Sequence, residues 1–102
     1  MTDGELHFYE DAELKHPIKT INWGRLPVGK KYEKTIYMAN PDKEWPIVNI
    51  TLNTNDEMLQ VEYPQVLRPN GKAEIKLSMD VLFSQNKGLA VAQMFTGEMF
   101  IG

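Results

Sequence analysis

The sequence predicts an all-β fold, a single β-sandwich of about seven strands, and three observations support this prediction. Apolar and polar residues alternate in several short runs, as they do in half-buried strands. Gly or Pro interrupts each stretch in which the helical spacing of apolar residues could develop. A length of 102 residues, with 42% hydrophobic and 25% charged residues, is typical of one small globular domain. There is no cysteine, so this core has to form without disulfides.

Seven runs alternate with period two and each predicts one strand, at residues 6–9, 18–23, 32–40, 47–53, 58–63, 73–79 and 95–101. Apolar residues share one face within each run, which gives the expected core sets Ile36 with Met38, Val48 with Ile50 and Leu52, Leu59 with Val61, Ile75 with Leu77, and Met99 with Ile101. We expect one domain over residues 5–102, preceded by a flexible tail at residues 1–4.

Turn residues separate these runs. Residues 40–43 (Asn-Pro-Asp-Lys), 69–72 (Pro-Asn-Gly-Lys) and 85–88 (Gln-Asn-Lys-Gly) each predict a chain reversal. The side-chain amide of Asn40 can cap the end of its strand. A glycine inside a strand indicates a close approach, so we expect Gly97 in the core beneath Trp23 or Trp45, with Trp23 buried as well.

Residues 80–92 fit the strand pattern less well, because they are more apolar than a solvated loop requires. The segment carries the apolar residues Val81, Leu82, Phe83, Leu89 and Val91 around the polar residues 85–88. One interpretation is a hairpin or short helical turn that packs on the sandwich. The other is a segment that contacts a partner, together with a sheet edge at residues 6–9 or 95–101.

Residues suited to catalysis are scarce. The chain has two histidines and two serines, and neither Ser78 nor Ser84 lies in the G-x-S-x-G turn of a hydrolase. His7 and His16, with Glu5, Glu10 and Asp11, hold the atoms for a metal site, but their spacing matches no usual ligand pattern. Phosphate-binding glycine motifs are absent too. We therefore expect no enzyme activity, no metal and no cofactor.

Charge is distributed unevenly along the chain, although the net charge is only −3. Residues 1–14 include five acids and no Lys or Arg, whereas residues 15–34 include six basic residues, among them the cluster Lys30, Lys31 and Lys34. Two solvated strand faces are the simpler interpretation and a polar docking surface is the other. The acidic total disfavours nucleic acid binding, for which Tyr32, Lys34 and Tyr37 are the candidate residues.

Residues 18–41 carry a family resemblance. The segment runs from a strand ending in Trp23-Gly24, through an apolar turn closed by Gly29, to a strand ending in Asn40. Later pieces agree, namely the strand that begins at Pro46-Ile47, residues 67–71 (Leu-Arg-Pro-Asn-Gly), and Phe95-x-Gly97-x-Met99-x-Ile101. This order resembles the Hydin-type and major-sperm-protein-like immunoglobulin modules over about 85 residues, with residues 80–92 as a departure from the pattern. The resemblance implies an immunoglobulin-like β-sandwich.

Modules of this kind are generally non-enzymatic and bind other proteins, and similar free-standing domains are accessory or decoration subunits of tailed-phage particles. The resemblance therefore implies a structural module whose partners are proteins of a larger assembly, copies of itself included. The expected contact residues are Val81, Leu82, Phe83, Leu89, Val91, Lys30, Lys31 and Lys34. The alternative is a glycan- or nucleic-acid-binding sandwich, with Trp45, Tyr37 and Tyr63 as the aromatic candidates for glycan.

No apolar run is long enough for a membrane span, and no secretion signal is visible. We expect a cytoplasmic product with a virion as its possible destination.

Overall fold

The structure is a computed structural model that describes residues 2–26, 28–29, 31–53, 59–80, 85–90 and 94–101, with only the backbone for residues 2, 21–26 and 85–90. Every named element in these ranges is a strand. The strands are β1 (Thr2–Asp3), β2 (His7–Tyr9), β3 (Thr20–Leu26), β4 (Lys31–Ala39), β5 (Ile47–Leu52), β6 (Leu59–Glu62), β7 (Lys72–Asp80), β8 (Gln85–Ala90) and β9 (Phe95–Met99). The prediction of an all-β chain is confirmed.

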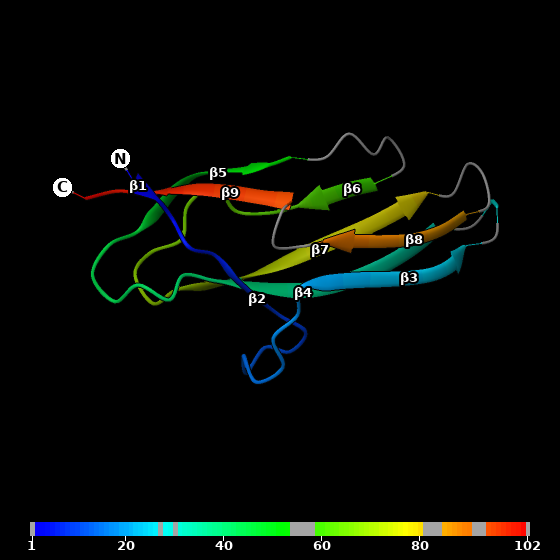
Figure 1. Cartoon of the computed structure of the whole chain (residues 1–102), viewed down its shortest axis with the longest axis horizontal. Helices are drawn as coiled ribbons and strands as arrows, with labels where there is room; N and C mark the ends of the chain where they lie inside the picture. The colour runs from blue at the N-terminus through cyan, green and yellow to red at the C-terminus, as the bar shows by residue number, and fades with distance from the viewer. Residues whose placement is uncertain are drawn as a thin grey trace.

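The described strands form three antiparallel sheets, ordered β2-β4-β7-β6, β1-β9-β5 and β3-β8. In Figure 1 the β1-β9-β5 sheet lies on the side of the N and C labels, and the β3-β8 ribbon lies in the opposite half of the molecule. The molecule is elongated, with extents of 47 × 27 × 16 Å. Its two ends therefore present separate surfaces.

The hydrophobic core lies between the four-stranded sheet and the β1-β9-β5 sheet. The ring of Phe8 on β2 stacks on that of Phe95 on β9, with 5.7 Å between centroids, and the Tyr63 ring meets Phe95 edge-on at 5.4 Å. The rest of the core consists of the inward-facing residues of β4, β5 and β7, which are almost fully buried: Ile36, Met38, Ile47, Ile50, Ile75, Leu77 and Met79. These contacts make the fold sandwich-like.

Two expected core faces differ from the prediction. A bulge shifts the register of β5 against β9 between Val48 and Thr51, so Ile47 is buried together with Ile50. Asn49 sits at this bulge with a φ of 53°, a left-handed conformation that Asn tolerates. Ile101 lies beyond the end of β9 and is 54% exposed, so its assignment to the core is wrong.

Three segments also pair differently from expectation. Thr2–Asp3 forms β1 against β9, and the Gly4 N–H donates to the Gly97 carbonyl at 2.9 Å, where a flexible tail is expected. Residues 85–88 belong to β8 and pair with β3, so the predicted turn there is wrong. Strand β3 also continues past Trp23-Gly24 to Leu26, with a register shift between Asn22 and Gly24.

Gly97 is buried, as expected, and its nearest neighbour among the described side chains is Ile47, not Trp45. A Cβ atom at this position would lie 2.5 Å from Cγ2 of Ile47 and 3.3 Å from Cγ1 of Ile50. Among the described side chains, Ile47 therefore takes the place that the prediction gave to Trp45. The side chain of Trp23 is outside the described part, so its predicted burial stays a prediction.

Candidate functional site

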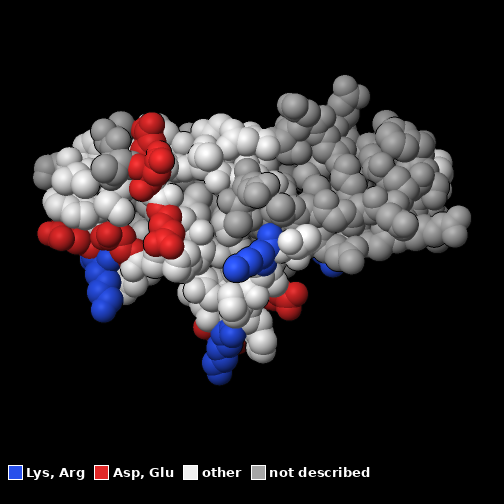
Figure 2. Space-filling model, in the orientation of Figure 1, with Lys and Arg blue, Asp and Glu red and all other residues white. Residues whose placement is uncertain are grey.

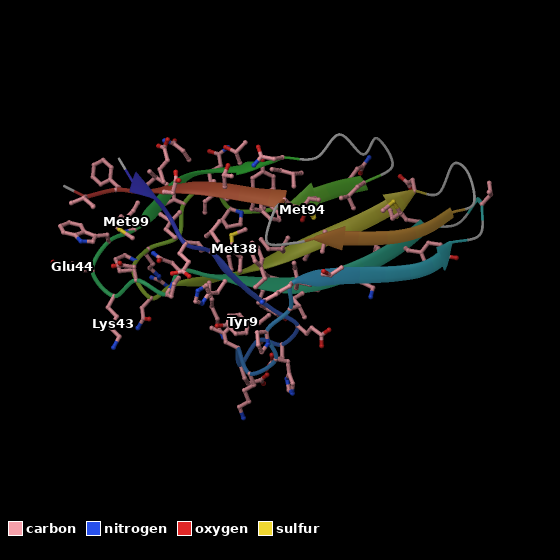
Figure 3. All side chains as sticks on the ribbon, viewed as in Figure 1. Tyr9, Met38, Lys43, Glu44, Met94 and Met99 are labelled. Atoms are coloured by element: carbon pink, nitrogen blue, oxygen red, sulfur yellow. The ribbon has the colours of Figure 1, made fainter. Side chains whose placement is uncertain are left out.

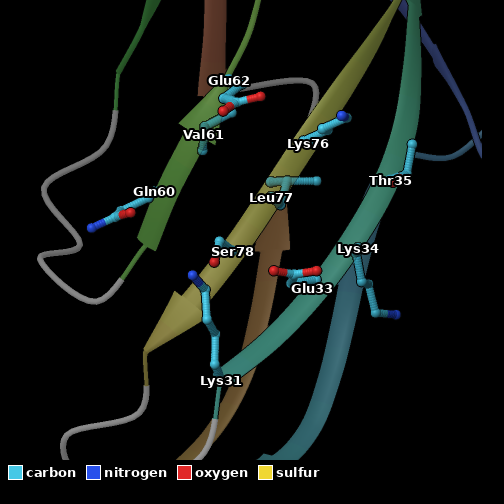
Figure 4. A pocket seen from close by; sticks show the side chains of 10 residues that line it. All are labelled: Lys31, Glu33, Lys34, Thr35, Gln60, Val61, Glu62, Lys76, Leu77 and Ser78. Atoms are coloured by element: carbon cyan, nitrogen blue, oxygen red, sulfur yellow. The ribbon is translucent and has the colours of Figure 1, made fainter.

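A depression of about 580 Å³ lies on the four-stranded sheet, and Figure 4 shows the side chains that line it. Strand register places these side chains in rows across β4, β7 and β6. Glu33, Ser78 and Gln60 form one row, and Thr35, Lys76 and Glu62 form the next. Because directly opposed residues of neighbouring strands share a face, both rows point to the same side of the sheet.

The lining is polar and carries both signs of charge, with Lys31, Lys76, Glu33 and Glu62 among its members. The hydroxyl oxygen of Ser78 is buried and has no hydrogen-bond partner among the described residues. An orphaned hydroxyl costs free energy unless a partner satisfies it. In the depression, the Ser78 hydroxyl therefore lies between Glu33 of β4 and Gln60 of β6 without a hydrogen-bond partner among the described residues.

The structure places the expected basic cluster only in part. Lys31 and Lys34 are exposed and both contribute to the lining of the depression. Their positions on β4 differ by an odd number of residues, so the strand directs the two side chains to opposite faces, and Figure 4 shows them diverging. Lys30 lies outside the described residues.

The apolar contact residues of the prediction are mostly not described. Val81, Leu82, Phe83 and Val91 lie outside the described residues, and only the backbone of Leu89 is given. Leu89 belongs to β8 and pairs with Ile21 of β3. The backbone of this part of the segment is therefore engaged within the chain.

The two sheet edges that were expected to dock are both occupied. Strand β9 lies between β1 and β5, so it is a central strand and not an edge. Strand β2 is an edge in the sheet order, but the returning chain covers it, because Ile18 N–H donates to the Phe8 carbonyl at 2.9 Å and Tyr9 forms a bridge with Pro17. Among the described residues, residues 2–4 cover residues 97–99 of β9 and the returning chain covers part of β2, so neither strand is free over its whole length.

A second hollow, of about 170 Å³, opens at the end of the sandwich near the termini and is lined by Glu5, Asn40, Pro41, Asp42 and Met99. We call it the Met99 pocket. Figure 3 shows Met99, the last residue of β9, at the same end of the molecule as Lys43 and Glu44. The next two residues along the chain, Phe100 and Ile101, are 51% and 54% exposed. Apolar surface and carboxylates therefore meet at this end.

Asn40 forms the wall of the Met99 pocket and is itself fully engaged. Its amide nitrogen lies 3.0, 3.2 and 3.3 Å from the carbonyl oxygens of Trp45, Arg68 and Leu67, and its amide oxygen accepts the Asp42 N–H at 3.0 Å. Asn40 is 2% exposed. The predicted capping role of this amide is confirmed, and it joins the end of β4 to two loops.

Asp42 fixes the loop beside the pocket. Its Oδ1 accepts the backbone N–H groups of Trp45 at 2.7 Å and Glu44 at 2.8 Å. These hydrogen bonds stabilise the ionised form and lower the pKa of Asp42 below its ordinary value. The carboxylate therefore remains negatively charged at neutral pH.

Each histidine pairs with a different acid. Nε2 of His7 lies 3.2 Å from Oε1 of Glu5, and Nδ1 of His16 lies 3.4 Å from Oδ1 of Asp11. Two opposing effects act on the pKa of Asp11. Burial raises it, but the hydrogen bonds from the backbone N–H groups of His16 and Lys15, together with the nearby His16 imidazole, have the larger combined effect. The pKa of Asp11 therefore lies below its ordinary value. Among the described residues no three His, Asp or Glu side chains gather as a metal site would require. Asp11 instead organises its own turn.

The aromatic candidates for glycan binding do not share a face. Tyr63 packs against Phe95 on the core side, whereas Tyr37 lies on β4 directly opposite Tyr9 of β2. Trp45 is in the loop that follows Asn40, and its backbone N–H donates to Oδ1 of Asp42. The candidates for nucleic acid binding are separated as well, because Tyr32 packs against the core while Tyr37 points to the other face of β4.

No protein-family model, curated protein or solved structure matches the chain. Within the described ranges, no helix has the length and hydrophobicity needed to span a bilayer.

Proposed function

We propose that this chain is a non-enzymatic interaction module, an immunoglobulin-like sandwich that acts as a subunit of a larger assembly. The observation that carries the proposal is the end of the molecule at which Phe100 and Ile101 are about half exposed and directly follow Met99, which lines a pocket with Glu5 and Asp42. Exposed apolar side chains close to charged groups are common in protein–protein contacts.

The strand order supports the immunoglobulin-like part of the proposal. When the short β1 and the β3-β8 ribbon are set aside, six strands remain in chain order. The first, second, fifth and fourth of them form the sheet β2-β4-β7-β6, and the third and sixth form the pair β5-β9. Immunoglobulin sandwiches have strands A, B, E and D in one sheet and C, F and G in the other, so the six strands match this order except for strand G.

The assembly implied by the family resemblance is a tailed-phage particle, in which the chain is a decoration or accessory subunit. Hydrogen exchange of the isolated protein, compared with the same protein in the particle or complex from which it is purified, tests the proposal. We expect slower exchange at residues 98–101 and 40–45 in the assembly. Identical exchange throughout the described residues in both states would contradict the proposal.

Binding of a small polar ligand such as a sugar is a second candidate, favoured by one observation. The unpartnered Ser78 hydroxyl lines a polar depression whose volume, about 580 Å³, lies within the roughly 300–1,000 Å³ of small-molecule sites. A glycan array with the wild-type protein and Gln60→Ala tests this candidate. Binding that this change abolishes would support it, and an array without any signal would exclude glycan.

A further inference from the structure

The four-stranded sheet has two edge strands, β2 and β6, and they differ in what lies beside them. The returning chain at residues 17–18 covers part of β2. Beside β6, no described residue forms a backbone hydrogen bond on the side that faces away from β7. An edge of this kind presents N–H and C=O groups with which a further strand can pair. We call the outer side of residues 59–62 the β6 edge.

The β6 edge lacks most of the features that normally prevent strand pairing. Residues 59–62 (Leu-Gln-Val-Glu) include no proline and no lysine, and their register with β7 runs without a bulge. The one charged residue of the edge is Glu62. Strands like those in Figure 2 that carry several acids would repel a neighbour, whereas this edge is suited to pairing and only Glu62 restricts which partner fits.

The side chains of the β6 edge alternate between two faces. Leu59 and Val61 lie on the core side, whereas Gln60 and Glu62 are exposed on the other face. Figure 4 shows the Gln60 side chain directed away from β7, past the edge of the sheet. Glu62 lies opposite Lys76 of β7, but neither Gln60 nor Glu62 has a side-chain hydrogen bond or an ion pair among the described residues. An amide donor and a carboxylate acceptor are therefore both available at this edge.

Two copies of the β6 edge fit each other in one antiparallel register. With Val61 opposite Val61 of the second copy, Gln60 lies opposite Glu62 of that copy, and the two-fold axis repeats this pair. The Gln60 amide then donates to the Glu62 carboxylate, while Lys76 stays on the other side of Glu62. Directly opposed polar pairs of this kind stabilise a sheet.

Other registers fit less well. A shift by one residue sets the polar side chains of one copy beside the core-facing side chains of the other. A shift by two residues in one direction places Glu62 against Glu62, where like charges repel. In the other direction it places Gln60 against Gln60 and leaves Glu62 without the amide. The β6 edge is therefore complementary to a second copy of itself, with Val61 at the centre.

We propose that two copies of this chain pair antiparallel through their β6 edges, with Val61 at the two-fold axis. The pairing joins two four-stranded sheets into one continuous sheet, in which β6 of one copy lies beside β6 of the other. The inference rests on the proposed function and names a second copy as one partner of the interaction module. Because both copies use the same surface, association stops at the dimer. Each copy contributes a strand of only 4 residues, so the dimer is weak and depends on concentration.

Sedimentation equilibrium of the full chain at concentrations up to about 1 mM tests the inference, because weak dimers form in this range. We expect wild-type protein to shift from monomer to dimer and no further. Gln60→Glu places a carboxylate opposite Glu62 twice in each dimer, so it should raise the dissociation constant by about fivefold or more. Gln60→Lys places a cation there instead and should lower the constant by about threefold.

The matched controls are Thr35→Glu and Thr35→Lys, which make the same changes in net charge. Thr35 is exposed on the same face of the sheet as Gln60, but it lies on the central strand β4 and not at the edge. Both controls should associate like wild type.

Cysteine cross-linking tests the register. The chain has no cysteine, so an introduced thiol can form a protein disulfide only with the same position of another copy. Directly opposed Cβ atoms lie about 5 Å apart, close to their separation in a disulfide, whereas diagonal neighbours lie about 7–8 Å apart. With oxidised glutathione as the oxidant, Val61→Cys should yield a covalent dimer, and Gln60→Cys should yield much less although Gln60 is more exposed. Thermal unfolding of the reduced variants checks that each remains folded.

Three results would overturn the inference. These are a wild-type protein that stays monomeric at every concentration, Thr35 controls that change the dissociation constant as much as the Gln60 variants do, and a Gln60→Cys variant that cross-links as readily as Val61→Cys. A monomeric wild type whose residues 98–101 are nevertheless protected in the native assembly would reject pairing through β6 and leave the proposed function standing.

Discussion

Two buried polar groups on the four-stranded sheet have opposite surroundings. Asn40, which follows β4, uses both ends of its amide in hydrogen bonds to the backbone. The Ser78 hydroxyl on β7 has no partner among the described residues. The two groups therefore have different roles. The Asn40 amide holds two loops together, whereas the Ser78 hydroxyl remains able to form a hydrogen bond at the surface depression.

Packing around the two positions differs in the same direction. Near Asn40 the sandwich is crowded, since a methyl group added at Gly97 would collide with Ile47. Around Ser78 the sheet is hollowed by about 580 Å³. Changes near Asn40 should therefore cost stability, and changes at Ser78 should affect it little.

Replacement of Asn40 should have the largest effect. Asn40→Ala leaves the carbonyls of Trp45, Leu67 and Arg68 without their shared donor, and we expect a loss of about 3 kcal/mol in the free energy of unfolding. Urea denaturation measures it. The control is Asn53→Ala, because the exposed amide of Asn53 donates only to the Thr96 hydroxyl among the described residues and its loss should change stability by less than about 0.5 kcal/mol. Equal losses in the two variants would remove the special role of Asn40.

A methyl group at Gly97 should have the next largest effect. Gly97→Ala forces Ile47 or the backbone to move, at a cost of about 1–3 kcal/mol. The same change in an Ile47→Ala background should cost clearly less, since the colliding Cγ2 atom is gone. If urea denaturation gives one and the same cost in both backgrounds, a contact other than Ile47 sets the crowding.

Removal of the Ser78 hydroxyl should be neutral or slightly stabilising. Ser78→Ala deletes a buried group that has no partner, so we expect a change between zero and a gain of about 1 kcal/mol. The midpoint of urea unfolding reports this change. A loss above about 1 kcal/mol would mean that the hydroxyl is bonded in the folded protein.

The smallest expected effect concerns pH and Asp42. The folded-state pKa of Asp42 lies below its ordinary value of 3.8, so its contribution to stability is complete above that value and is lost as the pH falls through the folded-state pKa. Asp42→Asn should therefore be less stable than wild type at pH 7, and the difference should narrow under acid. Thermal unfolding from pH 7 to pH 2 follows it. A constant difference would show that the charge is not involved.

Alternation and turn chemistry were enough to predict most of the fold. The core residues Ile36, Met38, Ile75 and Leu77 follow directly from period two. The reversal at residues 69–72 follows from Asn70 and Gly71, and Asn70 adopts a φ of 59°. Residues 85–88 have equally good turn chemistry and still form a strand, because pairing with β3 overrides local preference.

The candidate site was harder to predict, for a geometric reason. The polar positions of the depression are visible as the outward residues of predicted strands, Glu33 and Ser78 among them. Period two gives the face of each residue but not its cross-strand neighbour, which depends on register. The Met99 pocket was missed for the same reason, since it joins Glu5, residues 40–42 and Met99 only after the two layers meet.

The position of β9 affects how the protein folds. β9 lies between β1 and β5, so Thr2 has to meet Met99 across nearly the whole 102-residue chain before this sheet is complete. The antiparallel neighbours β6 and β7 are much closer in sequence and can pair first. During synthesis on the ribosome, residues 2–3 and β5 consequently remain unpaired with β9, their common partner, until residue 99 has emerged. During that interval the apolar face of β5 is open to other chains, which makes newly synthesised protein more prone to aggregate than refolding protein of full length.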